Sequence, residues 1–134
     1  MQRRTQLEGR FYLVVEDEYL AASTLVMALE DAGAEVAGPV SNVPGALQMV
    51  AERAGELDGA ILDINLRGVM AYSVAEKLAE AHIPFIFVTG YECGSMPQPF
   101  EDAPCLNKPC DEEELLNSLA ALPQREQPAG EQLL

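Results

Sequence analysis

The sequence contains no tryptophan, few aromatic residues and few basic residues. Aromatic side chains make up 6% of the 134 residues, so a hydrophobic core has to consist mainly of Val, Leu, Ile and Ala. Only 8 Lys and Arg residues accompany 22 Asp and Glu residues, which gives a net charge of −14 and a pI near 4.2. Such a charge repels phosphate backbones and argues against nucleic-acid binding, whereas it favours a cation or a basic partner surface.

Long hydrophobic runs are also absent. No apolar stretch approaches the roughly 20 residues that a membrane-spanning helix needs. The two arginines near the N-terminus are not followed by an apolar segment of signal-peptide length. We therefore expect a cytoplasmic protein that makes no membrane contact, with a single core in a chain of about one domain.

Cysteine is scarce and irregularly spaced. Cys93, Cys105 and Cys110 form no C-x-x-C pair, and the single histidine, His82, lies in another segment. A structural zinc site normally needs four ligands, so zinc is not expected. The sequence predicts three reduced thiols and a small, buried, space-filling role for Cys105.

Short apolar runs alternate with amphipathic ones along the chain. Gly33 is expected to stop the first helix, and Gly38-Pro39 to end the second strand. Capping residues precede the second and last helices, at Ser41 or Asn42 and at Asp111. Ala46, Leu47, Val50 and Ala51 are expected on the inner face of the second helix. The expected strands are 11–15, 34–37, 59–62, 84–88 and 104–107, and the other helices are 19–32 and 70–81.

This alternation predicts an α/β fold built from right-handed βαβ units. Five strands in this length fit a flavodoxin-like (βα)5 arrangement, a doubly wound parallel five-stranded sheet. We expect an N-terminal extension at 1–9, the domain at 10–122 and a flexible tail at 123–134.

The region between the last two strands, where a fourth helix is due, is poor in helix-forming sequence. Pro97, Pro99 and Pro104 each remove a backbone donor, and Gly94 interrupts the stretch before them. Helix four is therefore expected to be reduced or missing, leaving a mobile, partly apolar loop. Tyr91, Met96 and Phe100 are its candidate partner anchors.

Polar groups follow the ends of several predicted strands. In open α/β sheets, ligands bind beyond the carboxyl ends of the strands, so these groups should converge. Each residue alone also has a structural explanation as a strand-end or helix-start residue, but their combination in this order favours a site. The groups are Glu16, Asp17, Glu18, Asp63, Thr89 and Lys108.

The chemistry of such a pocket is that of phosphoryl transfer. Clustered carboxylates repel one another unless a hard cation joins them, and Mg²⁺ prefers oxygen ligands. Asp63 can act as a nucleophile and form an acyl phosphate. Lys108 and Thr89 can supply a positive charge and a donor to the phosphoryl oxygens.

The same residues lie in blocks that resemble the receiver domain of two-component response regulators. The blocks are LVVEDE at 13–18, LDINLRG at 62–68, FVTGY at 87–91 and LNKPC at 106–110. The resemblance covers about residues 10–122 and implies a stand-alone receiver, which is a phosphoacceptor signalling protein and not an enzyme acting on other substrates.

The resemblance also implies roles for individual residues. Asp63 is the expected phosphoacceptor for a sensor histidine kinase or a histidine phosphotransfer protein. Glu16, Asp17, Asp63 and the backbone carbonyl of Asn65 are the expected Mg²⁺ ligands. Thr89 corresponds to the switch hydroxyl and Lys108 to the phosphate-contacting lysine, with a cis bond before Pro109.

A narrower resemblance involves PFIFVTGY at 84–91, which is similar to the PFxFATGY signature of the "FAT GUY" receivers with Val88 in place of Ala. These usually serve HWE or related sensor kinases. One departure is Cys105, which stands three residues before Lys108, where most receivers carry an aromatic residue that moves with the switch hydroxyl. An order–disorder change of the preceding loop would replace that movement.

The leading hypothesis is a single-domain response regulator that signals to an unknown downstream protein or acts as a phosphate shuttle or sink. An aspartyl-phosphate hydrolase usually has a second acid two residues after the nucleophile, where this chain has Asn65. A flavin carrier would not place Glu16, Asp17 and Glu18 in its phosphate loop without a metal. A pseudo-receiver would not be expected to retain the phosphoacceptor together with Thr89 and Lys108.

Overall fold

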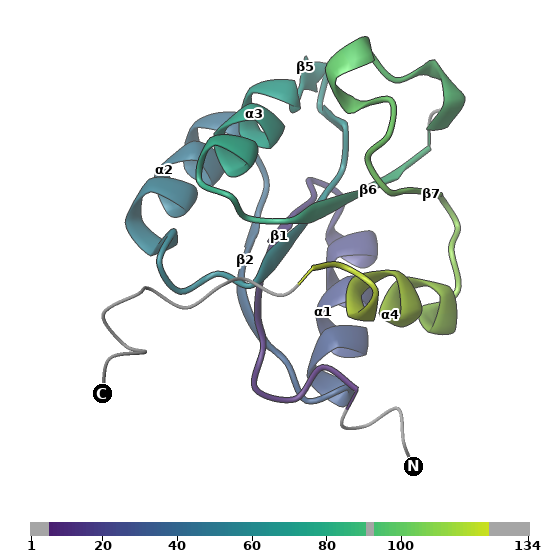
Figure 1. Ribbon diagram of the computed structural model, residues 1–134. Coiled ribbons are helices and arrows are strands. Elements are labelled where there is room, and N and C mark those ends of the chain that lie inside the picture. Colours follow the sequence, from purple (N-terminus) through teal and green to yellow (C-terminus); the bar gives the residue numbers. More distant parts are fainter. Residues whose placement is uncertain (1–5, 91–92, 124–134) are drawn as a thin grey trace.

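The computed structural model describes residues 6–90 and 93–123 and contains a five-stranded parallel sheet (Figure 1). Its strands are β1 (Phe11–Val15), β2 (Glu35–Val40), β3 (Gly59–Leu62), β6 (Phe85–Thr89) and β7 (Cys105–Asn107). Their spatial order is β2-β1-β3-β6-β7, so the strand order reverses between β1 and β3. The expected α/β flavodoxin-like fold is confirmed.

Within the described residues, four α-helices cover the two faces of the sheet. They are α1 (Tyr19–Asp31), α2 (Val43–Arg53), α3 (Tyr72–Glu80) and α4 (Glu112–Ala120). Helices α2 and α3 lie on one face and α1 and α4 on the other, each pair over its own apolar cluster. Both clusters consist largely of Val, Leu, Ile and Ala, as the composition predicts. None of the helices among the described residues is long and apolar enough to cross a membrane.

Two of the predicted helix caps form hydrogen bonds. The Asn42 side chain accepts from the backbone N–H of Gly45 at 2.7 Å, and Asp111 accepts from that of Glu114 at 2.7 Å. These contacts satisfy backbone donors that lack a partner in the first turn of a helix. They fix where α2 and α4 begin, and α4 starts directly after the segment that carries Lys108.

The segment between β6 and β7 contains no α-helix among its described residues, as the prolines predict. It forms two short 3₁₀ turns, η2 (Cys93–Ser95) and η3 (Gln98–Phe100). Phe100 is buried and stacks on Tyr72 with ring centroids 5.7 Å apart. Phe100 is therefore a core residue and not the exposed partner anchor that we expected; Met96 is half-buried, and Tyr91 lies outside the described residues.

The second strand is longer than predicted, because Gly38-Pro39 does not end it. Gly38 has φ of +99°, and a Cβ there would lie 2.9 Å from the carbonyl oxygen of Val14. The register between β1 and β2 shifts at this point, so that Leu13 pairs with Ala37 but Val15 pairs with Val40. The glycine thus forms a bulge that lets the strand continue past the proline.

Smaller differences concern the helix faces and the short elements. Ala51 is exposed, because the inner face of α2 is narrower than the sequence pattern suggested. A hairpin of β4 (Asn65–Leu66) and β5 (Val69–Met70) ends at Met70, where the third helix was expected to begin, and α3 starts at Tyr72. Within the expected N-terminal extension, Leu7 is fully buried and donates its N–H to the carbonyl of Ala32 at 3.0 Å.

The prediction of three reduced thiols is wrong for two of them. Cys93 and Cys105 form a disulfide with Cα atoms 5.7 Å apart, and Cys110 is free. The segment folds back so that η2 lies against β7. This places Cys93 and Cys105, which are 12 positions apart in the sequence, in contact. Cys105 is accordingly half-buried and cross-linked, and not a simple space-filling residue.

Candidate functional site

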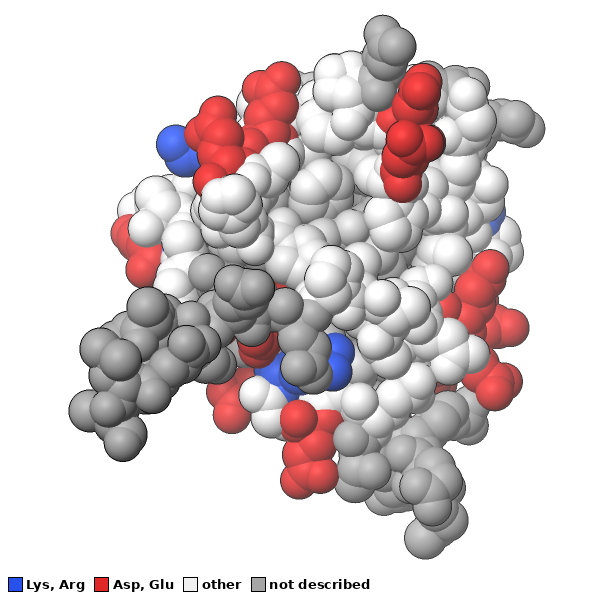
Figure 2. Space-filling model, viewed as in Figure 1, with Lys and Arg blue, Asp and Glu red and all other residues white. Residues whose placement is uncertain are grey.

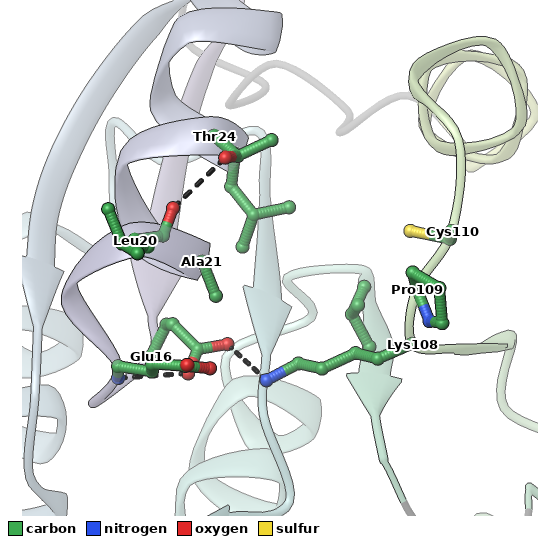
Figure 3. Close-up of a pocket in the computed structure, with 10 residues that line it drawn as sticks. Glu16, Leu20, Ala21, Thr24, Lys108, Pro109 and Cys110 are labelled. Atoms are coloured by element: carbon green, nitrogen blue, oxygen red, sulfur yellow. Dashed lines mark hydrogen bonds and ion pairs between the residues drawn. The ribbon is translucent and has the colours of Figure 1, made fainter.

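A pocket of about 470 Å³ opens between α1 and the segment that follows β7 (Figure 3). Its wall is largely apolar, formed in part by Leu20, Leu25 and Pro109. Glu16, which follows β1, and Lys108, which follows β7, lie together at its polar end, on the carboxyl edge of the sheet. The pocket therefore connects solvent with the charged groups that the sequence singled out.

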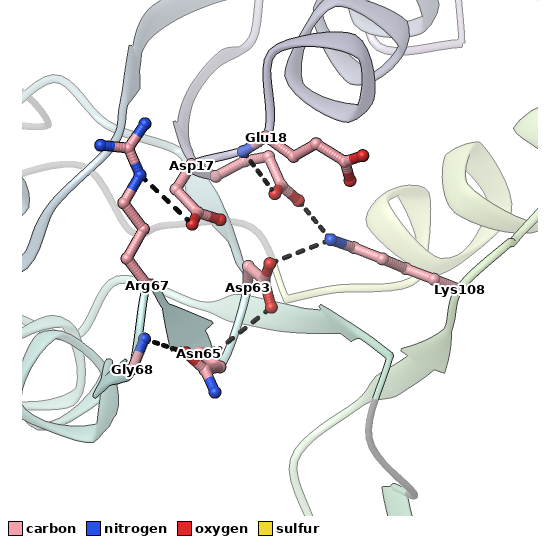
Figure 4. Close-up of polar contacts among 8 residues, drawn as sticks. Asp17, Glu18, Asp63, Asn65, Arg67, Gly68 and Lys108 are labelled. Carbon is pink, nitrogen blue, oxygen red and sulfur yellow. Dashed lines mark hydrogen bonds and ion pairs between the residues drawn. The ribbon is translucent and has the colours of Figure 1, made fainter.

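Two of the predicted carboxylates, those of Glu16 and Asp63, contact the ammonium group of Lys108 (Figure 4). Its Nζ lies 2.7 Å from Oε1 of Glu16 and 2.9 Å from Oδ2 of Asp63. The three residues follow β1, β3 and β7; β1 and β3 are neighbours in the sheet, and β6 lies between β3 and β7. A parallel sheet brings such strand ends to one edge, so the predicted convergence is found.

Asp63 is buried, and its two oxygens have different partners. Oδ2 contacts the ammonium of Lys108, and Oδ1 accepts a hydrogen bond from the backbone N–H of Asn65 at 3.3 Å. A buried carboxylate is tolerated only when it is paired and hydrogen-bonded, and both conditions hold. This explains how a strand buried on both faces can end in a charge.

Glu16 is 2% exposed and is more enclosed than Asp63. Its Oε2 accepts a hydrogen bond from the backbone N–H of Glu18 at 3.1 Å, while Oε1 meets Lys108. Burial raises the pKa of Glu16 above its ordinary value, although the contacts with Lys108 and Glu18 oppose this effect.

For Lys108, the contacts with neighbouring carboxylates together have a larger effect on the pKa than burial does. Burial alone would lower the pKa of Lys108, but the hydrogen bonds and charges of Glu16 and Asp63 outweigh it and raise the pKa. The lysine therefore carries a full positive charge at neutral pH. A fixed cation beside Asp63 is suited to attracting an anionic group.

Three carboxylates of the site are close enough to share a cation. One oxygen each from Glu16, Asp17 and Asp63 lies within 4.8 Å of the others. These are hard oxygen donors of the kind that Mg²⁺ prefers, so the donor set fits this ion. Lys108 offsets only part of their charge, which leaves a negative site for a divalent cation.

Sequence reasoning missed Arg67, whose Nε lies 3.7 Å from Oδ2 of Asp17. The contact arises from the β4–β5 turn, in which the Asn65 side chain accepts from the N–H of Gly68 at 2.6 Å and Arg67 has φ of +56°. The Asn-x-x-Gly spacing of this turn was a usable signal. The Arg67 side chain is 75% exposed, so we assign little stability to the pair.

Thr89 is fully buried at the end of β6, opposite Asn107 of β7. Its carbonyl accepts a hydrogen bond from the N–H of Lys108 at 2.7 Å, so the two residues are linked through the backbone. The bond between Lys108 and Pro109 is cis, as the resemblance implied.

The comparisons with known proteins agree with this geometry. The family model for the response regulator receiver domain matches residues 12–120. The chain belongs to the response regulator receiver family. A search of curated protein sequences gives no match.

Solved structures of receivers resemble the chain over most of its length. SdrG from Sphingomonas melonis Fr1 is 42% identical with a TM-score of 0.74, covering 84% of this chain and 94% of SdrG. The BeF₃-activated conformation of SdrG, ascribed to Pseudomonas melonis Fr1, is 43% identical with a TM-score of 0.70, covering 83% and 93%. The receiver domain of the hybrid histidine kinase CckA is 28% identical with a TM-score of 0.68, covering 81% and 94%.

Membership assigns a general activity to the chain. Receivers are phosphorylatable signalling domains that interact with histidine kinases or phosphotransfer proteins, and they generally bind Mg²⁺ at an acidic pocket. In this chain the carboxylates of Glu16, Asp17 and Asp63 lie close together.

Proposed function

We propose that this receiver accepts a phosphoryl group on Asp63 from a sensor histidine kinase or a histidine phosphotransfer protein, with Mg²⁺ as cofactor. The observation that carries the proposal is the ammonium of Lys108 held between Asp63 and Glu16 at the open edge of the sheet. In this assignment Mg²⁺ is held by Glu16, Asp17, Asp63 and the backbone carbonyl of Asn65. When bound, it neutralises negative charge on the phosphoryl oxygens.

The transfer step uses the Asp63 carboxylate as nucleophile. One of its oxygens forms a bond to phosphorus while the bond from phosphorus to the imidazole nitrogen of the donor breaks, and that nitrogen keeps the electron pair. Lys108 remains protonated, because its pKa is raised, and donates a hydrogen bond to a phosphoryl oxygen. The Thr89 hydroxyl is the proposed second donor.

The kinase class and the cellular role are further parts of the proposal. The PFIFVTGY segment supports a receiver of the "FAT GUY" type served by an HWE or related kinase, acting in the cytoplasm. The phosphorylated form then contacts a downstream protein or passes its phosphoryl group on as a shuttle or sink. The surface formed by the 93–103 segment and α4 is the proposed contact for that protein.

Mass spectrometry after treatment with acetyl phosphate and Mg²⁺ tests the phosphoacceptor. We expect the wild type to gain one phosphoryl group, Asp63→Asn to gain none, and Asp31→Asn, which changes an exposed carboxylate at the end of α1, to behave as wild type. Chelation of Mg²⁺ should abolish labelling. Equal labelling of Asp63→Asn would refute the assignment.

A further inference from the structure

Cys93 and Cys105 connect the two chain segments that carry Thr89 and Lys108. Cys93 lies four residues after Thr89, and Cys105 lies three residues before Lys108. In the sheet, Cys105 is paired with Phe87, two residues before Thr89 on β6. The disulfide therefore closes a loop directly beside the candidate phosphorylation site.

We propose that the Cys93–Cys105 pair is a reversible redox-modification site that reacts with low-molecular-weight thiols and disulfides and controls the mobility of the 93–103 segment. This inference goes beyond phosphoryl transfer and does not require it. Three structural features carry it: access to the sulfurs, the weak anchoring of the segment and the separation of the pair from Cys110.

Both cysteines are reachable from solvent. Each is half-buried, and Gly94, next to Cys93, is exposed. Cys105 belongs to β7, which is an edge strand of the sheet, so within the described part of the chain no strand pairs with the other side of its backbone. Thiol–disulfide exchange needs access for an attacking thiolate, and this geometry provides it.

Among the described residues, Phe100 and Ala103 anchor the far end of the segment, and nearer the disulfide the half-buried Met96 packs against the apolar cluster under α2 and α3. Phe100 packs against Tyr72, and its ring lies 5.9 Å from that of Phe87. The backbone N–H of Phe100 donates a hydrogen bond to the carbonyl of Pro97, and the N–H of Ala103 donates one to the carbonyl of Phe100. Reduction should therefore release the part around η2 while Phe100 stays in the core.

The third cysteine is separated from this pair by the sheet. Cys105 packs against the apolar cluster under α2 and α3, whereas Cys110 packs against the cluster under α1 and α4. Burial and the nearby Glu114 raise the pKa of the Cys110 thiol, which lowers its thiolate fraction. Cys93 and Cys105, with Cα atoms 5.7 Å apart, can close an intramolecular disulfide, whereas Cys110 has no such partner on its side of the sheet among the described residues.

The reaction balances with a small disulfide such as oxidised glutathione. A thiolate of one cysteine attacks it, which forms a mixed disulfide and releases one reduced glutathione. The thiolate of the second cysteine then attacks the protein sulfur of the mixed disulfide and releases the second reduced glutathione. The two cysteines lose two electrons and two protons in total, and the small disulfide gains them.

The covalent part of the proposal is tested by equilibrating the folded protein in buffers with different ratios of reduced and oxidised glutathione, followed by alkylation and mass spectrometry. We expect Cys93 and Cys105 to change together from alkylated to disulfide-bonded across these buffers, while Cys110 remains alkylated throughout. A pair that stays bonded in excess reduced glutathione, or stays reduced in excess oxidised glutathione, overturns the proposal.

Amide hydrogen exchange tests the effect on the segment. In wild type, reduction should speed exchange at residues 93–97 several-fold and change it little at residues 100–103. Cys93→Ser should resemble reduced wild type under all conditions, and Cys110→Ser should respond to reduction as wild type does. Equal exchange at residues 93–97 in oxidised and reduced wild type overturns the effect on mobility, and this result is independent of whether Asp63 is phosphorylated.

Discussion

Lys108 forms ion pairs with two carboxylates at once, which makes it the most consequential single side chain of the site. Glu16 and Asp63 are both buried, and each has one oxygen directed at the same ammonium. Removing the lysine leaves two enclosed negative charges close together. Their repulsion should appear in the stability of the protein as well as in phosphorylation.

We expect Lys108→Met to lower the free energy of unfolding by about 1–3 kcal/mol in the absence of divalent cations, since it unpairs buried carboxylates. Mg²⁺ should recover part of this loss, because it supplies the missing positive charge. Urea unfolding with and without Mg²⁺ measures both effects. Lys77→Met, at an exposed position of α3, is the control and should change stability little.

Tyr12 is a second side chain with a measurable electrostatic consequence. Its burial raises the pKa of the phenol, and the hydrogen bond from Arg10 only partly opposes this. The phenol of Tyr12 therefore has a higher pKa in the folded state than the ordinary value of 10.0, which applies to the unfolded state. Stability contributed by Tyr12 is present below that value and is lost as the pH rises toward the folded-state pKa.

We expect Tyr12→Phe to be less stable than wild type at neutral pH, with the difference shrinking or reversing between about pH 9 and pH 11. Urea midpoints of the two proteins over this range provide the measurement. A difference that stays constant with pH would show that the phenol does not titrate differently on folding.

The segment between β6 and β7 shows how one element can keep its place without regular secondary structure. Three prolines and a glycine prevent an α-helix, yet the segment crosses the end of the sheet in a defined path (Figure 1). A disulfide fixes one end and an aromatic cluster fixes the other. The aromatic anchor also contacts Phe85 and Phe87 of β6, so the segment is packed against the strand that carries Thr89.

We expect Phe100→Ala to reduce the free energy of unfolding by about 3–5 kcal/mol, as other truncations of buried aromatic residues do. It should also speed amide exchange at residues 97–103, because the aromatic anchor is lost. Denaturant unfolding and hydrogen exchange together check the two effects. Met27→Ala removes an exposed apolar side chain of α1 and should cost far less; equal losses in the two variants would contradict the anchoring role.

The molecule as a whole is strongly acidic, and red side chains outnumber blue ones on the face shown in Figure 2. Self-repulsion at a net charge of −14 lowers the stability of the compact state, and any salt relieves part of it by screening. A stabilising effect of Mg²⁺ therefore has two sources. One is general screening of the negative charge, and the other is binding to the cluster of Glu16, Asp17 and Asp63.

We expect Mg²⁺ to raise the melting temperature more than NaCl of the same ionic strength does. A concentration roughly ten times the Kd should add about 1.4 kcal/mol through binding to the folded state alone. Asp17→Asn should lose this additional part, and Asp31→Asn should keep it. Thermal melts with the two salts would reject a specific site if their effects were equal.

Much of this architecture could be predicted from short stretches of sequence. The bounds of β1 and β3, the caps at Asn42 and Asp111, and the loss of a helix before β7 all depend on neighbouring residues. The family could also be predicted, because the sequence blocks that identify it are short runs of neighbouring residues. The convergence at Lys108 could be predicted as well, because parallel strands bring their carboxyl ends to one edge.

Other features depend on residues that become neighbours only in the folded chain. The Cys93–Cys105 bond and the burial of Phe100 follow from the path of an irregular segment, which no periodic pattern specifies. The continuation of β2 requires the approach of Gly38 to the Val14 carbonyl across the β1–β2 pair. Local sequence determined which elements form and where their charges lie, because propensities and caps act over a few residues. Tertiary packing decided which loops are cross-linked and which strand continues, because those choices depend on contacts between distant segments.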